Sequence, residues 1–375
     1  MSAWPGKFAI GLTGNIATGK SVVRRMLEHL GAYGIDADAL AHRTFAPGAP
    51  GFKPVVEMFG RWILGEDGQI DRTRLGKIVF ADPEALARLE AIVHPLVGQA
   101  VDILIRRSKQ QVVVLEAIKL LEAGLGARCD SIWVAYAPAE VQLSRLVQKR
   151  GLSEQAARQR ILAQPPQEKK IAAANVVIHN YTSFEDTWRQ VFTAWEALFP
   201  GIQAVPEKEA RAGKYIVRRA RPRQAAEIAA FINAVGNGGK RLKREDIMEA
   251  FGEKAFLLLL RDERLLGLAG WQVENLVART GEITVSPEVP LEQGVRLLLD
   301  EVERASKELQ CEASLLFLPP ELARREAVWN ALGYEPRRIE SLSVSAWREA
   351  AKESMPEGTQ MLFKQLRKDR VLRPV

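Results

Sequence analysis

Short apolar runs alternate with longer amphipathic stretches over roughly the first 200 residues. The apolar runs are short enough for buried strands, and they cover 8–12, 33–35, 112–116, 132–136 and 176–179. The stretches between them, such as 20–30 and 139–149, carry apolar residues at helical spacing. Strand and helix in alternation predict a parallel β-sheet covered by helices on both faces, which is an α/β fold.

The pattern changes after Phe199-Pro200-Gly201, where a polar, charged stretch ends the helical periodicity. Beyond it, apolar strands at 256–261 and 265–273 flank a short turn, as in a β-hairpin, and helices and strands follow. This second part is predicted to be a smaller mixed-sheet α/β domain. We therefore divide the chain into a first domain at 1–200, a linker at 201–214, a second domain at 215–350 and a basic C-terminal tail at 351–375.

Composition narrows the class of protein. The chain has 375 residues, 47% hydrophobic and 26% charged, as in ordinary globular proteins of two or three domains. Its net charge of +7 is spread over both halves, so we expect no nucleic-acid surface, whereas anionic small molecules fit. The apolar stretch 255–260 is far too short to cross a membrane, and the start of the chain lacks an export signal. Cys129 and Cys311 lie far apart and form no disulfide or metal pattern, so we expect a reducing, cytoplasmic location.

A glycine-rich loop carries the clearest chemistry. Residues 14–21, GNIATGKS, fit the phosphate-binding pattern G-x-x-x-x-G-K-[ST] between a predicted strand and a predicted helix. Backbone N–H groups of such a loop surround phosphates, while Lys20 can reach the β- and γ-phosphates and Ser21 can bind Mg²⁺. The residues expected to hold ATP here are Gly14, Asn15, Ile16, Ala17, Thr18, Gly19, Lys20, Ser21 and Val22.

Two carboxylates, Asp36 and Asp38, come directly after the second predicted strand. They would lie at the carboxyl edge of the sheet beside the glycine loop, where open α/β sheets bind ligands. A carboxylate there could accept the proton of an acceptor hydroxyl. An Asp before a helix can also serve only as its N-cap, and the sequence does not decide which of the two is the base.

Arginines are frequent in the fourth helical region. Arg145, Arg150 and Arg160 are candidates for a lid that brings positive charge to a transferring phosphoryl group. The alternative for each is a solvated helix face.

Together these segments resemble the dephospho-CoA kinase family over about 7–195. The resemblance is carried by IGLTGNIATGKS, IDADALAH, the lid-like RLVQKRGLSEQAARQRILAQ, the last-strand segment ANVVIHN, and the whole run 47–97. Such a kinase transfers the γ-phosphoryl of ATP to the ribose 3′-hydroxyl of dephospho-CoA, with Mg²⁺, and yields CoA and ADP.

The resemblance implies a role for individual residues. Lys20, Asp38, Asp36 and Arg145 would be catalytic, with Ser21 on the metal. Arg150 and Asn180 would lie on the ATP side, and Asp36, Arg72, His94 and Glu122 would lie near the acceptor; for His94 a satisfied buried histidine is the alternative. The sequence departs from the family pattern at Lys119 and His179, among others, which puts acceptor affinity in doubt more than reaction type.

The second domain resembles the GNAT acetyltransferase fold in segments such as FLLLLRDERLLGLAGW and VWNALGYEP. Its chemistry looks degraded. Where the family has a pyrophosphate-binding loop, this chain has Pro290 and Glu292, and Trp329 stands in place of the family's tyrosine acid. We expect a non-catalytic domain for binding, dimerisation or regulation.

Alternatives stay open at this point: a bifunctional kinase with an active acetyltransferase, another small-molecule P-loop kinase, or a nucleotide-binding switch. The basic loop 239–244 is expected to be solvated, although it could bind phosphate or nucleic acid. Oligomeric state, lid motion and the ligand of the second domain do not follow from the sequence.

Overall fold

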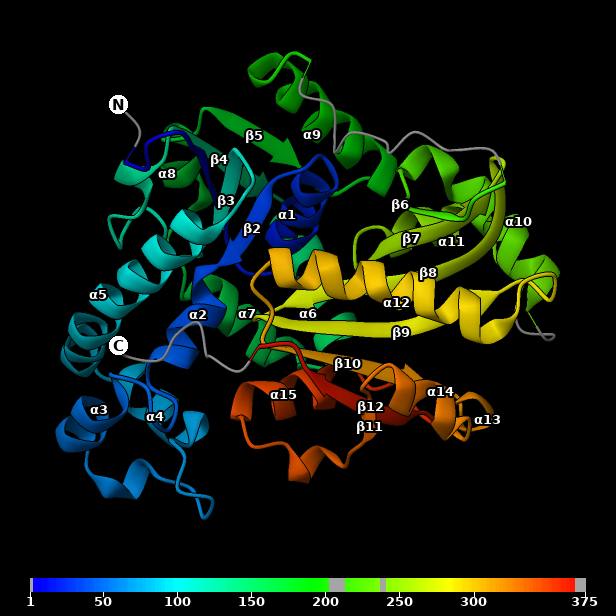
Figure 1. The fold of residues 1–375 in the computed structure, drawn as a ribbon. Coiled ribbons are helices and arrows are strands. Elements are labelled where there is room, and N and C mark those ends of the chain that lie inside the picture. Colours follow the sequence, from blue (N-terminus) through cyan, green and yellow to red (C-terminus); the bar gives the residue numbers. More distant parts are fainter. Residues whose placement is uncertain (1–2, 202–212, 237–240, 368–375) are drawn as a thin grey trace.

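The computed structural model describes residues 3–201, 213–236 and 241–367 of the chain, which fold around two β-sheets (Figure 1). The N-terminal sheet is five-stranded, in the order β2-β3-β1-β4-β5, and every adjacent pair is parallel. Its strands are β1 (Phe8–Thr13), β2 (Tyr33–Asp36), β3 (Val112–Glu116), β4 (Ser131–Tyr136) and β5 (Val176–His179). The predicted parallel sheet is confirmed.

Helices cover both faces of this sheet because its strands are apolar on both sides. On one face α1 (Lys20–His29) and α9 (Phe184–Leu198) pack on alternate residues such as Ile10 and Leu12. The other face packs against α2 (Ala37–Thr44), α3 (Phe52–Phe59), α4 (Arg72–Val79) and the long α5 (Pro83–Arg107). The arginine-rich region forms α6 (Ala139–Arg150), α7 (Glu154–Leu162) and α8 (Gln167–Ala172).

The C-terminal sheet is seven-stranded and mixed, in the order β11-β12-β10-β9-β8-β7-β6. Only β9 and β10 are a parallel pair. Its strands are β6 (Ile216–Arg219), β7 (Ala255–Arg261), β8 (Arg264–Glu274), β9 (Val277–Val285), β10 (Ala313–Leu318), β11 (Glu335–Pro336) and β12 (Gln360–Gln365). The expected mixed α/β sheet is confirmed.

Helices also lie on both faces of the second sheet. The long α12 (Leu291–Glu308) packs on one face, against Leu257, Leu259 and their neighbours. The opposite face is covered by α10 (Ala225–Val235), α11 (Arg244–Ala250) and α15 (Ser345–Ser354). Two short helices, α13 (Pro320–Ala323) and α14 (Glu326–Ala331), follow β10.

The expected C-terminal tail is wrong for residues 351–367. Residues of α15 continue to Ser354, and β12 inserts between β10 and β11, antiparallel to both. The cause is the apolar trio 361–363: Met361 and Leu362 are buried on opposite faces of the sheet. Residues 368–375, most of the linker 201–214, and Gly239 and Lys240 of the basic loop lie outside the described residues.

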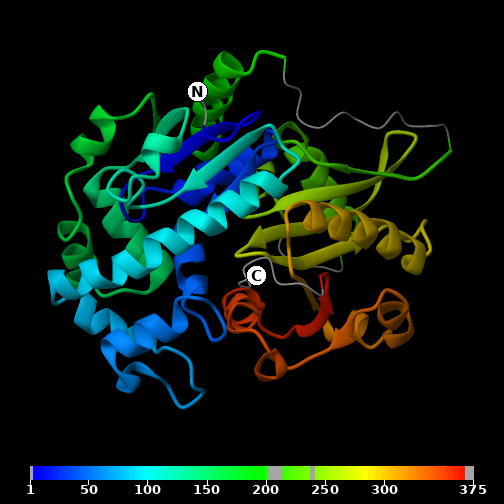
Figure 2. The same cartoon turned by 60° about the vertical axis from the view of Figure 1, so that its left-hand side comes forward.

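The two halves interlock through the β8–β9 hairpin, whose tip points at the N-terminal half (Figure 2). Asn275 and Leu276 form the turn with φ of 51° and 61°, a left-handed conformation that is unfavourable for leucine. Leu276 is nevertheless 7% exposed, in the apolar cluster that contains Tyr33 and Leu104. The tip of the second sheet therefore belongs to the hydrophobic core of the first half.

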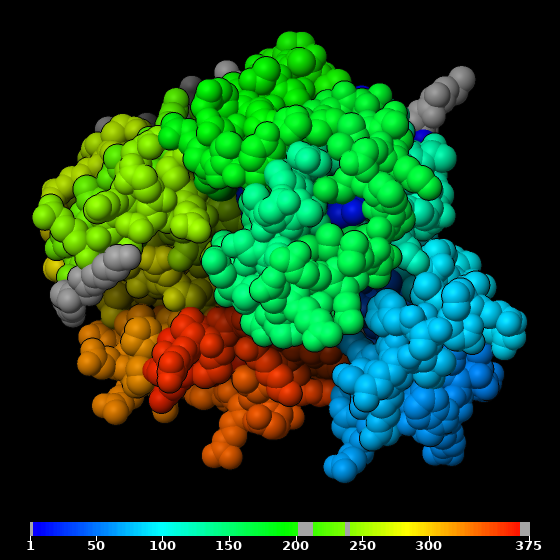
Figure 3. All heavy atoms as spheres, turned by 180° about the vertical axis from the view of Figure 1, so that it is seen from behind, coloured from blue at the N-terminus to red at the C-terminus, as the bar shows by residue number. Residues whose placement is uncertain are grey.

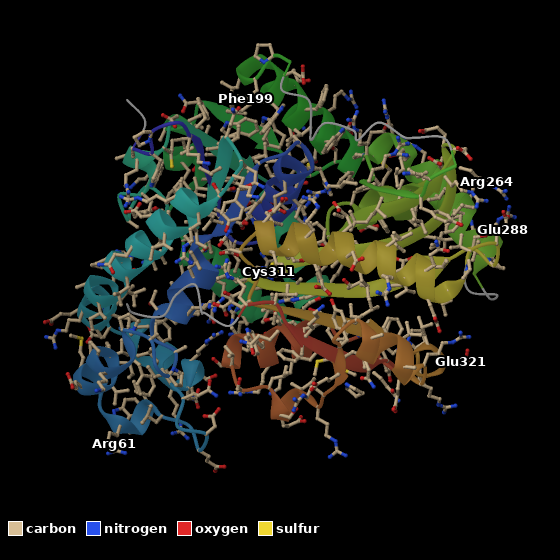
Figure 4. All side chains as sticks on the ribbon, viewed as in Figure 1. Arg61, Phe199, Arg264, Glu288, Cys311 and Glu321 are labelled. Carbon is tan, nitrogen blue, oxygen red and sulfur yellow. The ribbon has the colours of Figure 1, made fainter. Side chains whose placement is uncertain are left out.

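A buried ion pair reinforces the same junction. Arg43 donates to Glu312 at 2.6 Å and to the Asn275 carbonyl at 2.8 Å, and both charged side chains are buried. Cys311, beside Glu312, is fully buried where the two halves meet (Figure 4). Among the described residues, no helix is long and apolar enough to cross a membrane.

Candidate active site

The glycine loop lies between the end of β1 and the start of α1, as predicted, and both of its glycines combine a positive φ with little room for a side chain. Gly14 has φ of 149°, and a Cβ on it would lie 2.3 Å from the Ala135 carbonyl oxygen. Gly19 has φ of 89°, and a Cβ there would lie 1.8 Å from Asn180 Nδ2. The loop is therefore pressed against the carboxyl ends of β4 and β5, with its N–H groups preceding a helix N-terminus.

Lys20 is the first residue of α1 and is 8% exposed. Its Nζ donates to the Asn15 carbonyl at 3.2 Å, so the side chain folds back over the loop. Burial lowers the pKa of Lys20, whereas the nearby carboxylates Glu116, Asp38 and Asp36 act in the opposite direction. The ammonium is thus held between the phosphate loop and a group of acids.

Glu116, at the end of β3, is a site residue that the sequence analysis missed. Ser21 Oγ donates to Glu116 Oε1 at 3.0 Å, and Arg24 Nε donates to Glu116 Oε2 at 2.7 Å. Its only signal in the sequence is an acid ending an apolar strand. The role of Glu116 becomes evident only from the sheet order. Because β3 lies beside β1, the carboxylate at the end of β3 lies next to the glycine loop that follows β1.

The structure separates the two aspartates. Asp36 is the N-cap of α2 and accepts from the Ala39 amide at 2.8 Å. Asp38 accepts instead from the Ile118 amide, in the loop after β3, at 3.0 Å. Burial is the main cause that raises the pKa of both carboxyl groups, and Glu116 adds to the rise. For Asp36 the cap interpretation is right, and Asp38 is the carboxylate directed across the sheet edge.

Lys170, on α8, is a second residue that the sequence analysis missed. It is 2% exposed, and its Nζ donates to the Ile118 carbonyl at 2.7 Å. Burial lowers its pKa, and it interacts electrostatically with Glu122, Lys20 and Asp38. No pattern in the sequence distinguishes this lysine from Lys169 beside it.

Arg145 and Asn180 lie together on the other side of the loop, as expected for the ATP side. Arg145 donates to the carbonyls of Ala17 at 3.1 Å and of Asn180 at 2.8 Å. The Asn180 side chain donates to the Thr18 carbonyl at 2.9 Å. These bonds connect α6 and the end of β5 to the glycine loop.

A cavity of about 550 Å³ opens beside this group. Lys20, Ser21, Arg145, Arg150 and Asn180 are among its lining residues. This volume falls within the ~300–1,000 Å³ of small-molecule sites. The cavity therefore places most of the predicted nucleotide-side residues around one space.

The predicted acceptor residues are less closely assembled. Arg72 is half exposed and pairs with Glu349 of α15 at 2.9 Å. His94 is half-buried on α5, and Glu122 is exposed but interacts electrostatically with Lys170. Arg160 lies exposed on α7 and is not a lining residue of the cavity.

The oxygen ligands next to the loop suit Mg²⁺. Ser21 and Glu116 offer a hydroxyl and a carboxylate side by side at 3.0 Å. Among residues 3–201, 213–236 and 241–367, no cluster of three His, Cys, Asp or Glu side chains could hold a metal. Mg²⁺ at nucleotide sites is held through one or two side chains plus the phosphates, and Ser21 and Glu116 are the side chains available for that role.

A glycine loop on a parallel sheet, a buried lysine on it and carboxylates at the adjoining strand ends define a P-loop kinase. A family model described as dephospho-CoA kinase matches residues 8–186. A dephospho-CoA kinase of Geobacter metallireducens is 46% identical over 190 residues, which are 94% of that protein and 50% of this chain. The chain belongs to the dephospho-CoA kinase family, and its N-terminal half is a kinase of coenzyme A biosynthesis with ATP as phosphate donor.

Solved structures resemble each half separately. TT1252 from Thermus thermophilus is 33% identical with a TM-score of 0.47, and the match covers 52% of this chain and 99% of that one. A PaiA N-acetyltransferase from Thermoplasma acidophilum, solved with coenzyme A, is 11% identical with a TM-score of 0.32; it covers 40% of this chain and 99% of its own. At that level, the second likeness says nothing of activity.

Proposed function

We propose that this kinase phosphorylates the ribose 3′-hydroxyl of dephospho-CoA at the cluster formed by Lys20, Ser21, Asp38 and Glu116. The observation that supports this is the arrangement of that cluster: a buried lysine on a phosphate loop faces carboxylates from the ends of two neighbouring strands. Phosphoryl transfer depends on positioning and on charge stabilisation, and these groups can provide both.

In the proposed reaction the acceptor oxygen attacks the γ-phosphorus of ATP, and the bond from that phosphorus to the ADP oxygen breaks. Asp38 takes the hydroxyl proton, since its carboxylate is directed toward the Ile118 loop and close to Lys20. Lys20 holds the β- and γ-phosphates, and Lys170 stabilises the negative charge on the acceptor side. CoA and ADP are released.

Asp36 is proposed as a positioning residue, because its carboxylate is already used as the cap of α2. Ser21 and Glu116 would hold Mg²⁺, which neutralises charge on the phosphates when it is bound. Arg145, Arg150 and Asn180 would bind ATP from the α6 side. Arg72, His94 and Glu122 are proposed contacts of dephospho-CoA; Arg72 would then exchange its partner Glu349 for the substrate.

We propose that the C-terminal half is not an acetyltransferase. Trp329 is 1% exposed, and its indole N–H donates to the Leu322 carbonyl at 2.9 Å, so it is a core residue. Pro290 is the N-cap of α12 and has no N–H to offer a phosphate, and Glu292 adds negative charge to the first turn of that helix. Both cysteines are free thiols, which is in keeping with a cytoplasmic enzyme.

Analysis of the reaction product tests this assignment. After incubation with ATP, Mg²⁺ and dephospho-CoA, phosphorus NMR should show one new phosphomonoester on the ribose 3′-oxygen. A phosphate at any other position would contradict the proposed acceptor. In a parallel incubation with acetyl-CoA and a panel of amines, no free CoA thiol should appear; its release would contradict a silent C-terminal half.

A further inference from the structure

The cavity beside the glycine loop has a second wall that comes from the C-terminal half. One wall consists of the loop, α6 and the segment after β5. The facing wall is α11 and the turn after it, with the lining residues Arg244, Glu245, Met248, Glu249, Gly252 and Glu253. Seen from behind, the green N-terminal surface meets the yellow-green C-terminal surface along this side of the molecule (Figure 3). The similar kinase described above spans only 50% of this chain, so this wall has no counterpart in the match.

The facing wall is firmly attached to the kinase half. Met248 and Phe251 are buried in one apolar cluster that also contains Phe184 of α9. A Cβ on Gly252 would lie 3.2 Å from the Phe184 ring, so the turn packs closely on that helix. His29 of α1 bonds to the Phe251 carbonyl at 2.8 Å. The wall is therefore anchored to the helices that flank the nucleotide site.

The two walls carry opposite charge. Lys20, Arg145, Lys149 and Arg150 line the kinase side. Three carboxylates, Glu245, Glu249 and Glu253, line the facing wall beside Arg244, while Glu185 of α9 lies on the kinase side. Two exposed ion pairs cross the space, Arg244–Glu185 at 3.0 Å and Lys149–Glu249 at 3.8 Å.

This polarity matches the two ends of a nucleotide. Phosphates are anionic and belong at the glycine loop and its cations. The nucleoside end has hydrogen-bond donors, namely the ribose hydroxyls and the amino group of adenine. Carboxylates can only accept, so the acidic wall suits the nucleoside and repels phosphate.

We propose that α11 and the following turn form the nucleoside wall of the ATP site, with Glu249 and Glu253 accepting hydrogen bonds from the nucleoside. The inference rests on the proposed assignment of ATP to this cavity. It gives the C-terminal half a function in catalysis without any chemistry of its own: it completes the site for the phosphate donor. The kinase half and the accessory half then act as one enzyme.

The sign of the effect of neutral variants on ATP affinity tests the proposal. The double variant Glu249→Gln plus Glu253→Gln in the full chain should raise the KM for ATP about 5–10-fold, because two exposed charged acceptors become neutral acceptors that hold the nucleoside less strongly. The values of kcat and of the KM for dephospho-CoA should change less than about 2-fold. A wall that merely stands near the phosphates predicts the opposite, because removing negative charge would then lower the KM for ATP.

The matched control is Glu357→Gln, an exposed glutamate of the same half that does not line the cavity. It should leave the KM for ATP unchanged. Titration calorimetry with ADP gives a readout that does not depend on the acceptor, and ADP should bind the double variant about 5–10-fold more weakly than the parent chain. Unchanged or tighter binding of ADP to the double variant would overturn the proposal that α11 contacts the nucleoside. Absence of turnover with dephospho-CoA, with the ADP effect intact, would overturn only the proposed acceptor.

Discussion

Lys20 is buried and interacts electrostatically with three carboxylates, Glu116, Asp38 and Asp36. A neutral side chain at this position would lack those interactions. Lys20→Met keeps the length of the side chain and removes the charge that we assign to the phosphates. Turnover should fall by ~10³-fold or more, because a preorganised cation at developing charge is worth several kcal/mol. Steady-state ADP release measures this, with the thermal unfolding midpoint as the check on folding. A well-folded variant with near-normal turnover would refute the role of Lys20.

Asp38 and Asp36 differ in their partners, and their variants should differ accordingly. Asp38→Asn should lower kcat by ~10²–10⁴-fold, the range of a lost general base. Asp36→Asn should lower kcat much less, since asparagine caps a helix as well as aspartate does. A larger effect of Asp36→Asn than of Asp38→Asn would reverse the assignment.

The pH profile is a separate test of the carboxylates. Burial raises the pKa of Asp38 above its ordinary value of 3.8. A base acts only when deprotonated, so kcat/KM should be full above the raised pKa and should fall as the pH drops through it. The acid limb should therefore lie at higher pH than an ordinary aspartate gives, and it should disappear in Asp38→Asn. A limb near pH 4 in the parent enzyme would contradict a buried base.

At the scale of elements, the β8–β9 hairpin is the part most dependent on its surroundings. Leu276 has an unfavourable left-handed backbone conformation, and its side chain packs in the hydrophobic core of the N-terminal half. Leu276→Ala should lower the free energy of unfolding by about 2–4 kcal/mol through the cavity it leaves. Leu162→Ala, on a leucine that is 83% exposed, is the control and should change it by less than ~0.5 kcal/mol. Urea unfolding of both variants measures the two free energies of unfolding. Equal values for Leu276→Ala and Leu162→Ala would mean that the hairpin tip is not packed in the core of the N-terminal half.

The elements also show what the sequence could and could not predict. The glycine loop is predictable because all of its functional residues lie within eight consecutive positions. The parallel strands are predictable because each is a local apolar run. Glu116 and Lys170 were missed because their roles depend on which strands and helices are neighbours. The sequence around β12 predicts a tail, because the strand forms only by pairing with β10, more than 40 residues earlier in the chain. Likewise, Asp38 and Asp36 are distinguished by their partners in the fold, the Ile118 amide for Asp38 and the Ala39 amide for Asp36.

At the scale of the molecule, the junction of the halves contains a histidine that must stay neutral. His29 Nε2 faces the Phe251 carbonyl, which can only accept, so Nε2 carries the proton. Nδ1 then accepts from Arg219 at 3.4 Å, and Trp188 and Phe251 enclose the ring. Burial, with Arg219 and Arg25 nearby, lowers the pKa of His29 to about 3.

The stability of the junction should therefore depend on pH. Below pH 6.5 His29 takes up a proton in the unfolded chain, whereas in the folded chain it stays neutral down to about pH 3. The contribution of this group is thus full well above pH 6.5, and the free energy of unfolding should fall by ~1.6 kcal/mol between pH 6.5 and 5 from this group alone. His29→Gln keeps an N–H donor and does not titrate, so its stability should fall less over the same range. Parallel losses in both proteins would show that His29 is not the group responsible.

The central claim is that this two-part chain phosphorylates dephospho-CoA. Its most direct test is ADP release by the 375-residue chain with ATP and Mg²⁺, measured with and without dephospho-CoA. The account predicts ADP formation that requires dephospho-CoA, matches the CoA formed one to one, and is lost in Lys20→Met. ADP formation at the same rate without dephospho-CoA, or none in its presence, would contradict it.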